Sequence, residues 1–273
     1  TSKNENLNTH YTYFGRTKLR VLFHKILIEL KQKYRQRFIN KYFLRDVNLC
    51  EPFIYFPLHM DMEQNPLITA PFYTNQIEVI RYIAKSLPIG YKIFVKEHPS
   101  QVLRGWRTIS QYRDMMDIPN VSLIHPTYNT KNLLENCALI ITISGSAGLE
   151  GAFFNKSTII FTDLRYSVLP SVYRLKILED LPNAIKTSLL RKIKAEDLEK
   201  YVNYIEKNSF EFNYGEFIIK EANSFSLGGF FADSKITELQ VKAFLIENKK
   251  VLENISNEHI KKLKSMTDNT LKQ

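Results

Sequence analysis

The chain has 273 residues, is 44% hydrophobic and 24% charged, and carries a formal net charge of +10. This is the composition of an ordinary globular protein, long enough for one large domain or two small ones. The two cysteines, Cys50 and Cys137, are too few for a disulfide scaffold, and we expect buried free thiols in a reducing compartment. No apolar run approaches the roughly 20 residues of a membrane-spanning helix, and no signal peptide opens the chain, so we expect a soluble, cytoplasmic protein.

Residues 1–50 form a basic segment, with 11 Lys or Arg against 3 Asp or Glu. Over residues 16–41 the basic side chains alternate with apolar ones, which predicts a basic amphipathic helix. The plainest interpretation is a solvated helix packed on the domain. Attraction to an anionic membrane surface, which would place the protein at the inner membrane face, is the second. Nucleic acid is the third, and we expect no such partner because no recognition motif with the required spacing occurs.

Residues 51–185 alternate short β-branched and aromatic runs with helical patterns, which is typical of parallel βαβ units. The expected strands are residues 53–58, 92–96, 121–124, 138–143 and 157–161. The expected helices between them are residues 75–86, 103–115, 129–135 and 146–153. Several strands are almost continuously apolar, so both faces of the sheet should be covered. The fold class is therefore α/β, with a Rossmann-like parallel sheet flanked by N- and C-terminal helices.

Residues 186–273 form a third region, which the pattern predicts to be helical and polar. Helices are expected at residues 195–208, 235–248 and 257–266, with a glycine-containing loop at 224–233. The last residues, from 265 to 273, are typical of a frayed tail.

A turn of small residues follows the fourth expected strand, at residues 144–148, and is called the serine turn below. A strand that enters such a turn and then a helix points backbone N–H groups and the positive helix end at one place, which favours an anion. The expected phosphate-binding members are Ser144, Gly145, Ser146, Ala147 and Gly148. The alternative is an ordinary tight turn, and the sequence is neither a P-loop nor a GxGxxG motif.

Charged residues and histidines occupy the other strand ends, where ligands of an open parallel sheet bind. His98 could donate to a phosphate or protonate a leaving group, or it could be a packed core histidine, and Lys96, two residues before it, is a further candidate phosphate-binding residue. His125 repeats the His-Pro pattern more weakly and is also a candidate at the phosphate, although a structural role is favoured there. Glu150, early in the helix after the serine turn, could accept hydrogen bonds from ribose or sugar hydroxyls or face solvent.

Two carboxylates, Asp61 and Glu63, follow the first expected strand. Either could act as a base on an acceptor hydroxyl or bind donor hydroxyls, although such pairs are common on any surface. A metal site made of His59, Asp61 and Glu63 is disfavoured because no matching ligand set occurs elsewhere, and no metal or cofactor is expected.

Three motifs together resemble the capsule polysaccharide biosynthesis proteins, which include bacterial capsule Kdo transferases. They are Tyr-Phe-Pro-Leu-His at 55–59, Lys-Glu-His-Pro at 96–99 and Ser-Gly-Ser-Ala-Gly-Leu-Glu-Gly-Ala at 144–152. The His-Pro and serine motifs are also similar to those of bacterial sialyltransferases. The resemblance implies a GT-B fold whose C-terminal domain binds a nucleotide-activated sugar, often CMP-linked, with His98, Ser144 and Ser146 at the phosphate.

Many of these relatives read Leu-His-x-x-Pro-Glu in the first loop, whereas Met62 stands here where the proline would be. Glu63 keeps the acid, and the resemblance favours it as the catalytic carboxylate. A GT-B enzyme has two Rossmann-like domains, and the residues before Glu51 are too few to form the first. We therefore expect that the acceptor domain is missing, reduced or supplied by another chain.

The expected function is the donor-binding half of a glycosyltransferase that moves a sugar from a nucleotide-sugar to a glycan or glycolipid acceptor in surface or capsular polysaccharide synthesis. A UDP-sugar 2-epimerase-like enzyme, which shares the GT-B architecture, is one alternative. A non-catalytic scaffold of a capsule assembly complex is another.

Overall fold

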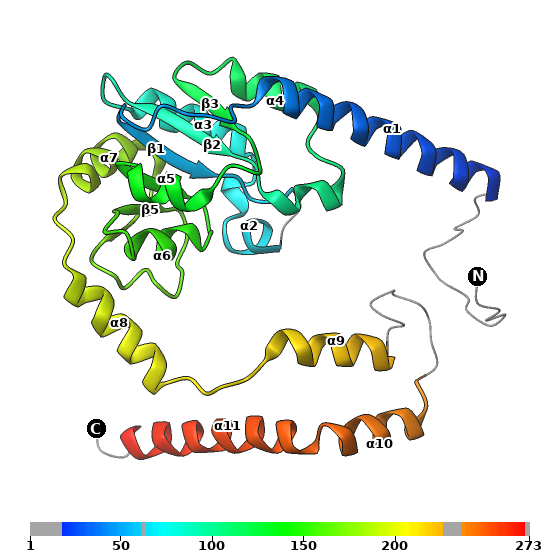
Figure 1. The fold of residues 1–273 in the computed structure, drawn as a ribbon. Helices are drawn as coiled ribbons and strands as arrows, with labels where there is room; N and C mark the ends of the chain where they lie inside the picture. The colour runs from blue at the N-terminus through cyan, green and yellow to red at the C-terminus, as the bar shows by residue number, and fades with distance from the viewer. Residues whose placement is uncertain (1–17, 62–63, 226–235, 271–273) are drawn as a thin grey trace. The chain divides into compact units, whose positions relative to one another are not determined.

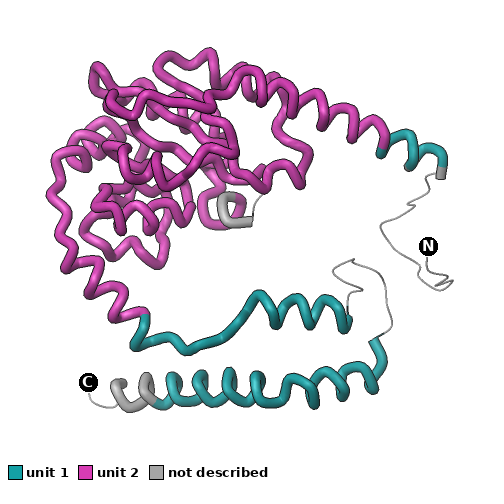
Figure 2. The backbone as a smooth tube through the Cα atoms, viewed as in Figure 1, with its two compact units in different colours: residues 1–25, 206–273 teal, residues 26–205 magenta. Residues whose placement is uncertain are grey.

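The computed structural model describes residues 18–61, 64–225 and 236–270. The chain divides into two compact units, which Figure 2 colours separately. The sheet unit comprises residues 26–205, and the helical unit comprises residues 1–25 and 206–273.

Within the described residues, six parallel strands form one sheet in the order β3-β2-β1-β4-β5-β6 (Figure 1). The strands are β1 (Phe53–Pro57), β2 (Lys92–Lys96), β3 (Val121–Ile124), β4 (Leu139–Thr142), β5 (Thr158–Ile160) and β6 (Val172–Arg174). The prediction of a Rossmann-like parallel sheet is confirmed, and the five expected strands are present. Strand β6 was not expected from the sequence, because it is only three residues long and exposes its last residue.

Helices cover both faces of the sheet, as expected for a parallel sheet with apolar strands. They are α3 (Gln76–Ser86), α4 (Ile109–Met116), α5 (Thr130–Asn136), α6 (Ala147–Ala152) and α7 (Leu181–Leu190), while α2 (Gln64–Thr69) belongs to the connection between β1 and α3. Ile54 and Phe56 of β1 share one apolar cluster with side chains of α3, α4 and α7. Phe53 and Tyr55 point to the other face and pack with α5 and the start of α6. Alternate residues of one strand therefore belong to two separate cores.

The predicted helix at residues 103–115 starts too early. The structure has a 3-10 helix, η2 (Pro99–Arg104), followed by Gly105 and Trp106 with φ of 83° and 61°. This left-handed turn ends the first helix, and Thr108 then begins α4 with a capping box to Gln111. The sequence analysis also missed α2 and α7, although Pro182 near the start of α7 is a helix-start signal.

The helices outside the sheet are α1 (Lys18–Tyr42), α8 (Ala195–Lys207), α9 (Tyr214–Phe225), α10 (Glu238–Glu247) and α11 (Lys249–Thr270). The helices expected at 16–41, 195–208 and 235–248 are confirmed over their described residues, and α9 was missed. The last helix runs from 249 to 270 and is longer than the expected 257–266, so most of the expected frayed tail is helical. The expected loop at 224–233 lies almost wholly outside the described residues.

Both cysteines are free thiols, as expected. Cys137 is buried, but the prediction for Cys50 is wrong because it lies exposed in the connection between α1 and β1. Among the described residues, no helix has the length and apolar character needed to cross a membrane.

Candidate functional site

A pocket of about 350 Å³ opens at the carboxyl edge of the sheet. Three segments form its walls. They are β1 and the following loop (residues 55 and 57–59), the end of β2 and the following loop (residues 96–99), and the end of β4 with the serine turn and the start of α6 (residues 142, 144–147 and 150). Thr130, the first residue of α5, completes the lining. Strand β1 has β2 on one side and β4 on the other, so the direction of strand order changes here. In open parallel sheets ligands bind at this switch point, and the volume suits a small molecule.

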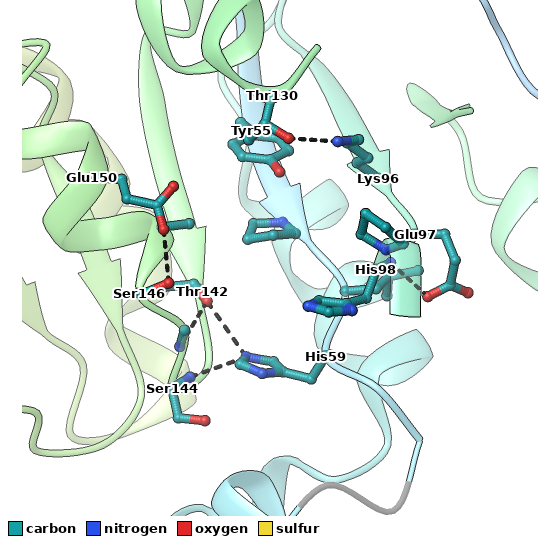
Figure 3. Close-up of a pocket in the computed structure, with 15 residues that line it drawn as sticks. Tyr55, His59, Lys96, Glu97, His98, Thr130, Thr142, Ser144, Ser146 and Glu150 are labelled. Carbon is teal, nitrogen blue, oxygen red and sulfur yellow. Dashed lines mark hydrogen bonds between the residues drawn. The ribbon is translucent and has the colours of Figure 1, made fainter. Parts of the chain in front are cut away.

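His59, in the loop after β1, holds the serine turn in place. The backbone N–H of Ser144 donates to Nε2 of His59, at 3.2 Å (Figure 3). The N–H of Gly145 donates to Oγ1 of Thr142, so these two amides have protein acceptors. Since Nε2 of His59 accepts, the proton of the neutral ring is on Nδ1. His59 is therefore a positioning residue that joins the loop after β1 to the turn after β4.

Two serine hydroxyls differ in their surroundings. The hydroxyl of Ser146 donates to Glu150, at 2.7 Å, at the exposed start of α6. Oγ of Ser144 is buried and has no hydrogen-bond partner among the described residues. An unsatisfied buried hydroxyl is unfavourable, so a ligand atom that accepted its proton would stabilise the turn.

His98 begins η2 at the pocket wall. Its Nδ1 accepts a hydrogen bond from the backbone N–H of Ser100, at 3.1 Å. The proton of the neutral imidazole is therefore on Nε2, which makes that nitrogen a hydrogen-bond donor. His98 is exposed, so this donor is accessible to a molecule in the pocket.

Lys96 places a positive charge in the pocket wall. Its side chain is buried, and its ammonium donates to the hydroxyl of Thr130. Figure 3 shows Lys96, Thr130 and Tyr55 together at one end of the pocket. Among the described residues no carboxylate lies within ion-pair distance of this ammonium, and burial lowers the pKa of Lys96. A buried cation without a counter-charge favours binding of an anion.

Arg107, which could not be singled out from sequence, pairs with two acids, Glu97 in the pocket wall and Asp61 in the loop after β1. Nε of this buried guanidinium donates to Glu97 at 2.9 Å, and its other nitrogens bond Asp61 and the carbonyl of His59. Tyr112 and the backbone N–H of His98 also donate to Glu97. Burial raises the pKa of Glu97, while Arg107 and Tyr112 lower it. Arg107 thus connects the loops that carry both pocket histidines.

The structure brings together most of the expected site residues. Lys96, His98, Glu150 and residues 144–147 line the pocket. Asp61 is not part of the lining, because it pairs with Arg107. Glu63 lies outside the described residues.

His125 also lies apart from the pocket. It is buried and contacts Thr127, Asn40 and Arg45 through its ring nitrogens. Burial, and secondly the charge of Arg45, lowers the pKa of His125. These contacts support the structural role that the sequence analysis favours for His125.

Some lining residues could not be singled out from sequence. His59 was considered only as a metal ligand, although it lies two residues after the end of β1 and closes the first motif. Thr130 lies beyond the end of β3, and only the Asn-Thr helix start marks it. Among the described residues, no three His, Cys, Asp or Glu side chains are grouped so that they could hold a metal ion.

Gly148, the last residue of the serine turn, is buried in α6 and does not line the pocket. A Cβ at this position would lie 2.6 Å from Oη of Tyr166 and 2.8 Å from Cγ2 of Thr158. Tyr166 also donates to the carbonyl of Gly145. The absence of a side chain at Gly148 therefore makes room for Tyr166 and not for a ligand.

Gly148→Ala is expected to lower the free energy of unfolding by about 1–3 kcal/mol through overpacking. Helix propensity alone predicts the opposite sign. Gly215→Ala in α9 is the matched control. A Cβ at Gly215 would have Oδ1 of Asn213 as its nearest neighbour, at an ordinary contact distance of 3.8 Å. Urea denaturation of both variants measures the difference, and a stabilised Gly148→Ala would contradict the packing argument.

Comparisons with known proteins identify a family from the sequence of the chain. A sequence model of the family described as capsule polysaccharide biosynthesis protein matches residues 8–169. No curated protein is significantly similar to the chain. The solved structure of UDP-GlcNAc 2-epimerase from Methanocaldococcus jannaschii is 16% identical with a TM-score of 0.42, over 66% of this chain and 52% of that one.

Two further solved structures come from KpsC of Thermosulfurimonas dismutans. Its β-Kdo 2,4-transferase is 16% identical, with a TM-score of 0.38, over 58% of this chain and 54% of that one. Its β-Kdo 2,7-transferase is 12% identical, with a TM-score of 0.36, over 70% of this chain and 64% of that one. The chain spans about half the length of the first of these structures.

Proposed function

Because the chain belongs to the capsule polysaccharide biosynthesis protein family, we propose that it binds the nucleotide-sugar donor of a glycosyltransferase in surface polysaccharide synthesis. The observation that carries the proposal is the pocket at the switch point of the sheet. A buried cation, a histidine donor and an unsatisfied serine hydroxyl line it together. These are groups that favour a phosphate.

The donor phosphate is proposed to lie between Lys96, His98 and the serine turn. Lys96 supplies the counter-charge, and Nε2–H of His98 donates to a phosphoryl oxygen. When the bond between the sugar and the phosphate breaks, negative charge grows on the departing phosphate. Donors that are already in place stabilise this charge most in a site with little water.

Two carboxylates complete the proposal. Glu150 lines the pocket and can accept hydrogen bonds from ribose or sugar hydroxyls. Glu63, which follows β1 in the sequence, is proposed as the base that takes the proton of the acceptor hydroxyl. Asp61 is not assigned this role, because its carboxylate pairs with Arg107.

A thermal-shift experiment with CMP, CDP, UDP and GDP tests the proposal. A nucleotide at about 100 times its Kd stabilises the folded state by about 2.7 kcal/mol, which raises Tm by about 5 °C or more. The family resemblance favours CMP as the nucleotide with the largest shift. If none of the four raises Tm, the donor-binding proposal fails, and the non-catalytic scaffold is left as the alternative function. Release of an epimerised UDP-sugar without any acceptor would instead select the 2-epimerase reaction.

The two His-Pro histidines give a matched pair of variants. His98→Ala is expected to weaken nucleotide binding about tenfold or more, because it removes a donor to a charged group. His125→Ala is expected to leave the affinity unchanged, since His125 is not part of the pocket lining. Isothermal titration of each folded variant measures the difference. Equal losses in both variants would refute the placement of the phosphate at His98.

A further inference from the structure

Within the sheet unit, which begins at residue 26, helix α1 packs with only one of its faces. Gln32 donates to the carbonyl of Val102, and Arg35 donates to the carbonyls of Gly105 and Trp106. Ile39 is fully buried near the end of the helix. Gln32, Arg35 and Ile39 follow one another at helical spacing, so they define the packed face.

The opposite face of α1 carries an apolar stripe that is exposed. Its members share the spacing of one helical face within the sheet unit, and all are exposed. The stripe comprises Ile26, Leu27, Leu30 and Tyr34. Apolar side chains usually occur singly on a surface, and a continuous row of them indicates an interaction surface.

The charge of α1 selects the kind of partner. Its sequence contains eight Lys or Arg residues and one acid, Glu29. By helical spacing, Lys31 and Lys33 lie on opposite flanks of the stripe next to Leu30. Long basic side chains beside an apolar stripe can reach lipid phosphates while the stripe enters the acyl boundary.

We propose that the apolar stripe of α1 lies in the interface of a membrane that contains anionic lipids, with the flanking cations at the headgroups. The bilayer interface offers an apolar layer together with negative charge. The apolar stripe of α1 matches the first and its flanking lysines match the second. The helix would lie along the surface, since no described helix is suited to cross a membrane. The proposal concerns a surface remote in sequence from the pocket motifs and does not depend on nucleotide binding.

Flotation of the whole chain with vesicles tests the proposal. Vesicles of phosphatidylcholine with about 30% phosphatidylglycerol should bind the protein, and vesicles of phosphatidylcholine alone should bind it at least about tenfold more weakly. Raising the salt from about 0.1 M to about 0.5 M should release much of the bound protein, because it screens the headgroup attraction.

Two isoleucines of α1 provide a matched pair of variants. Ile26 belongs to the stripe and is 47% exposed, whereas Ile28 lies on another face and is 46% exposed. Ile26→Gln combined with Leu30→Gln should reduce vesicle binding about tenfold or more, and Ile28→Gln should leave it nearly unchanged. All these side chains are exposed, so the variants should keep the wild-type Tm.

Three outcomes would overturn the proposal. They are no preference for anionic vesicles, equal losses in the stripe and control variants, or a wild-type dimer that the stripe variant converts to a monomer. The last outcome would assign the stripe to a second copy of the chain. A variant that loses vesicle binding but keeps its nucleotide-induced rise in Tm would show that the two properties are separate.

Discussion

Arg107→Met is expected to lower the free energy of unfolding by about 3–5 kcal/mol, because it leaves a buried carboxylate without its partner. The side chain of Arg107 is 4% exposed and that of Glu97 is fully buried. Methionine fills much of the space of the arginine stem, so the loss comes chiefly from charge and hydrogen bonds. In the same variant the carboxylate of Asp61 loses the donor Arg107, and the carbonyl of His59 keeps only its hydrogen bond from Gln76.

The pH dependence of this variant follows from the state of Glu97. Without Arg107, burial is expected to raise the pKa of Glu97 in the folded protein well above its value in the unfolded chain. The folded state then holds a proton that the unfolded state has released, so stability falls as the pH rises between these two pKa values. The variant should therefore lose less stability at about pH 5 than at about pH 8.

Glu97→Gln in the Arg107→Met background is the control. A neutral amide can remain buried without a counter-charge, so the extra loss at higher pH should disappear in the double variant. Urea denaturation of the wild type and both variants at the two pH values measures this. If Arg107→Met destabilises the protein equally at both pH values, the carboxylate of Glu97 is not the source of the loss.

The sheet could be predicted from sequence because its strands are short apolar runs bounded by polar residues. Residues 139–142 and 158–160 are buried throughout, as a central parallel strand requires. The edge of the sheet at which the site lies could also be predicted, since the carboxyl ends of parallel strands meet at one side of a sheet. This rule was enough to bring Lys96, His98 and the serine turn together.

The contacts that shape the site could not be predicted, because they join residues that are distant in sequence. The bond from Ser144 to His59 spans 85 positions and exists only because β1 and β4 are neighbours. Arg107 reaches Glu97 only because Gly105 and Trp106 turn the chain back in left-handed conformations. Gly148 is among the residues expected to bind the phosphate, whereas Tyr166 fills the space beside it.

Lys96→Met is expected to weaken nucleotide binding about 100-fold and at the same time to stabilise the nucleotide-free protein. The ammonium is the counter-charge proposed for the donor phosphate, and removing one partner of a close charge pair in a low-dielectric site causes a large loss. In the empty pocket the same ammonium is buried with a hydroxyl as its only partner among the described residues. Replacing it with an apolar side chain of similar length should raise the stability by about 1 kcal/mol or more.

The two opposite signs distinguish a ligand-binding lysine from a structural one, which would lose stability on substitution. Burial lowers the pKa of Lys96 in the folded protein, so its destabilising effect is complete below that pKa and fades as the pH rises toward the ordinary lysine value. The stability advantage of Lys96→Met should therefore be largest near neutral pH and shrink toward about pH 10. Lys92→Met, at the other end of β2, is the control: Lys92 forms a surface pair with Glu51, so both affinity and stability should change little. Wild-type nucleotide affinity in Lys96→Met would move the phosphate away from this end of the pocket.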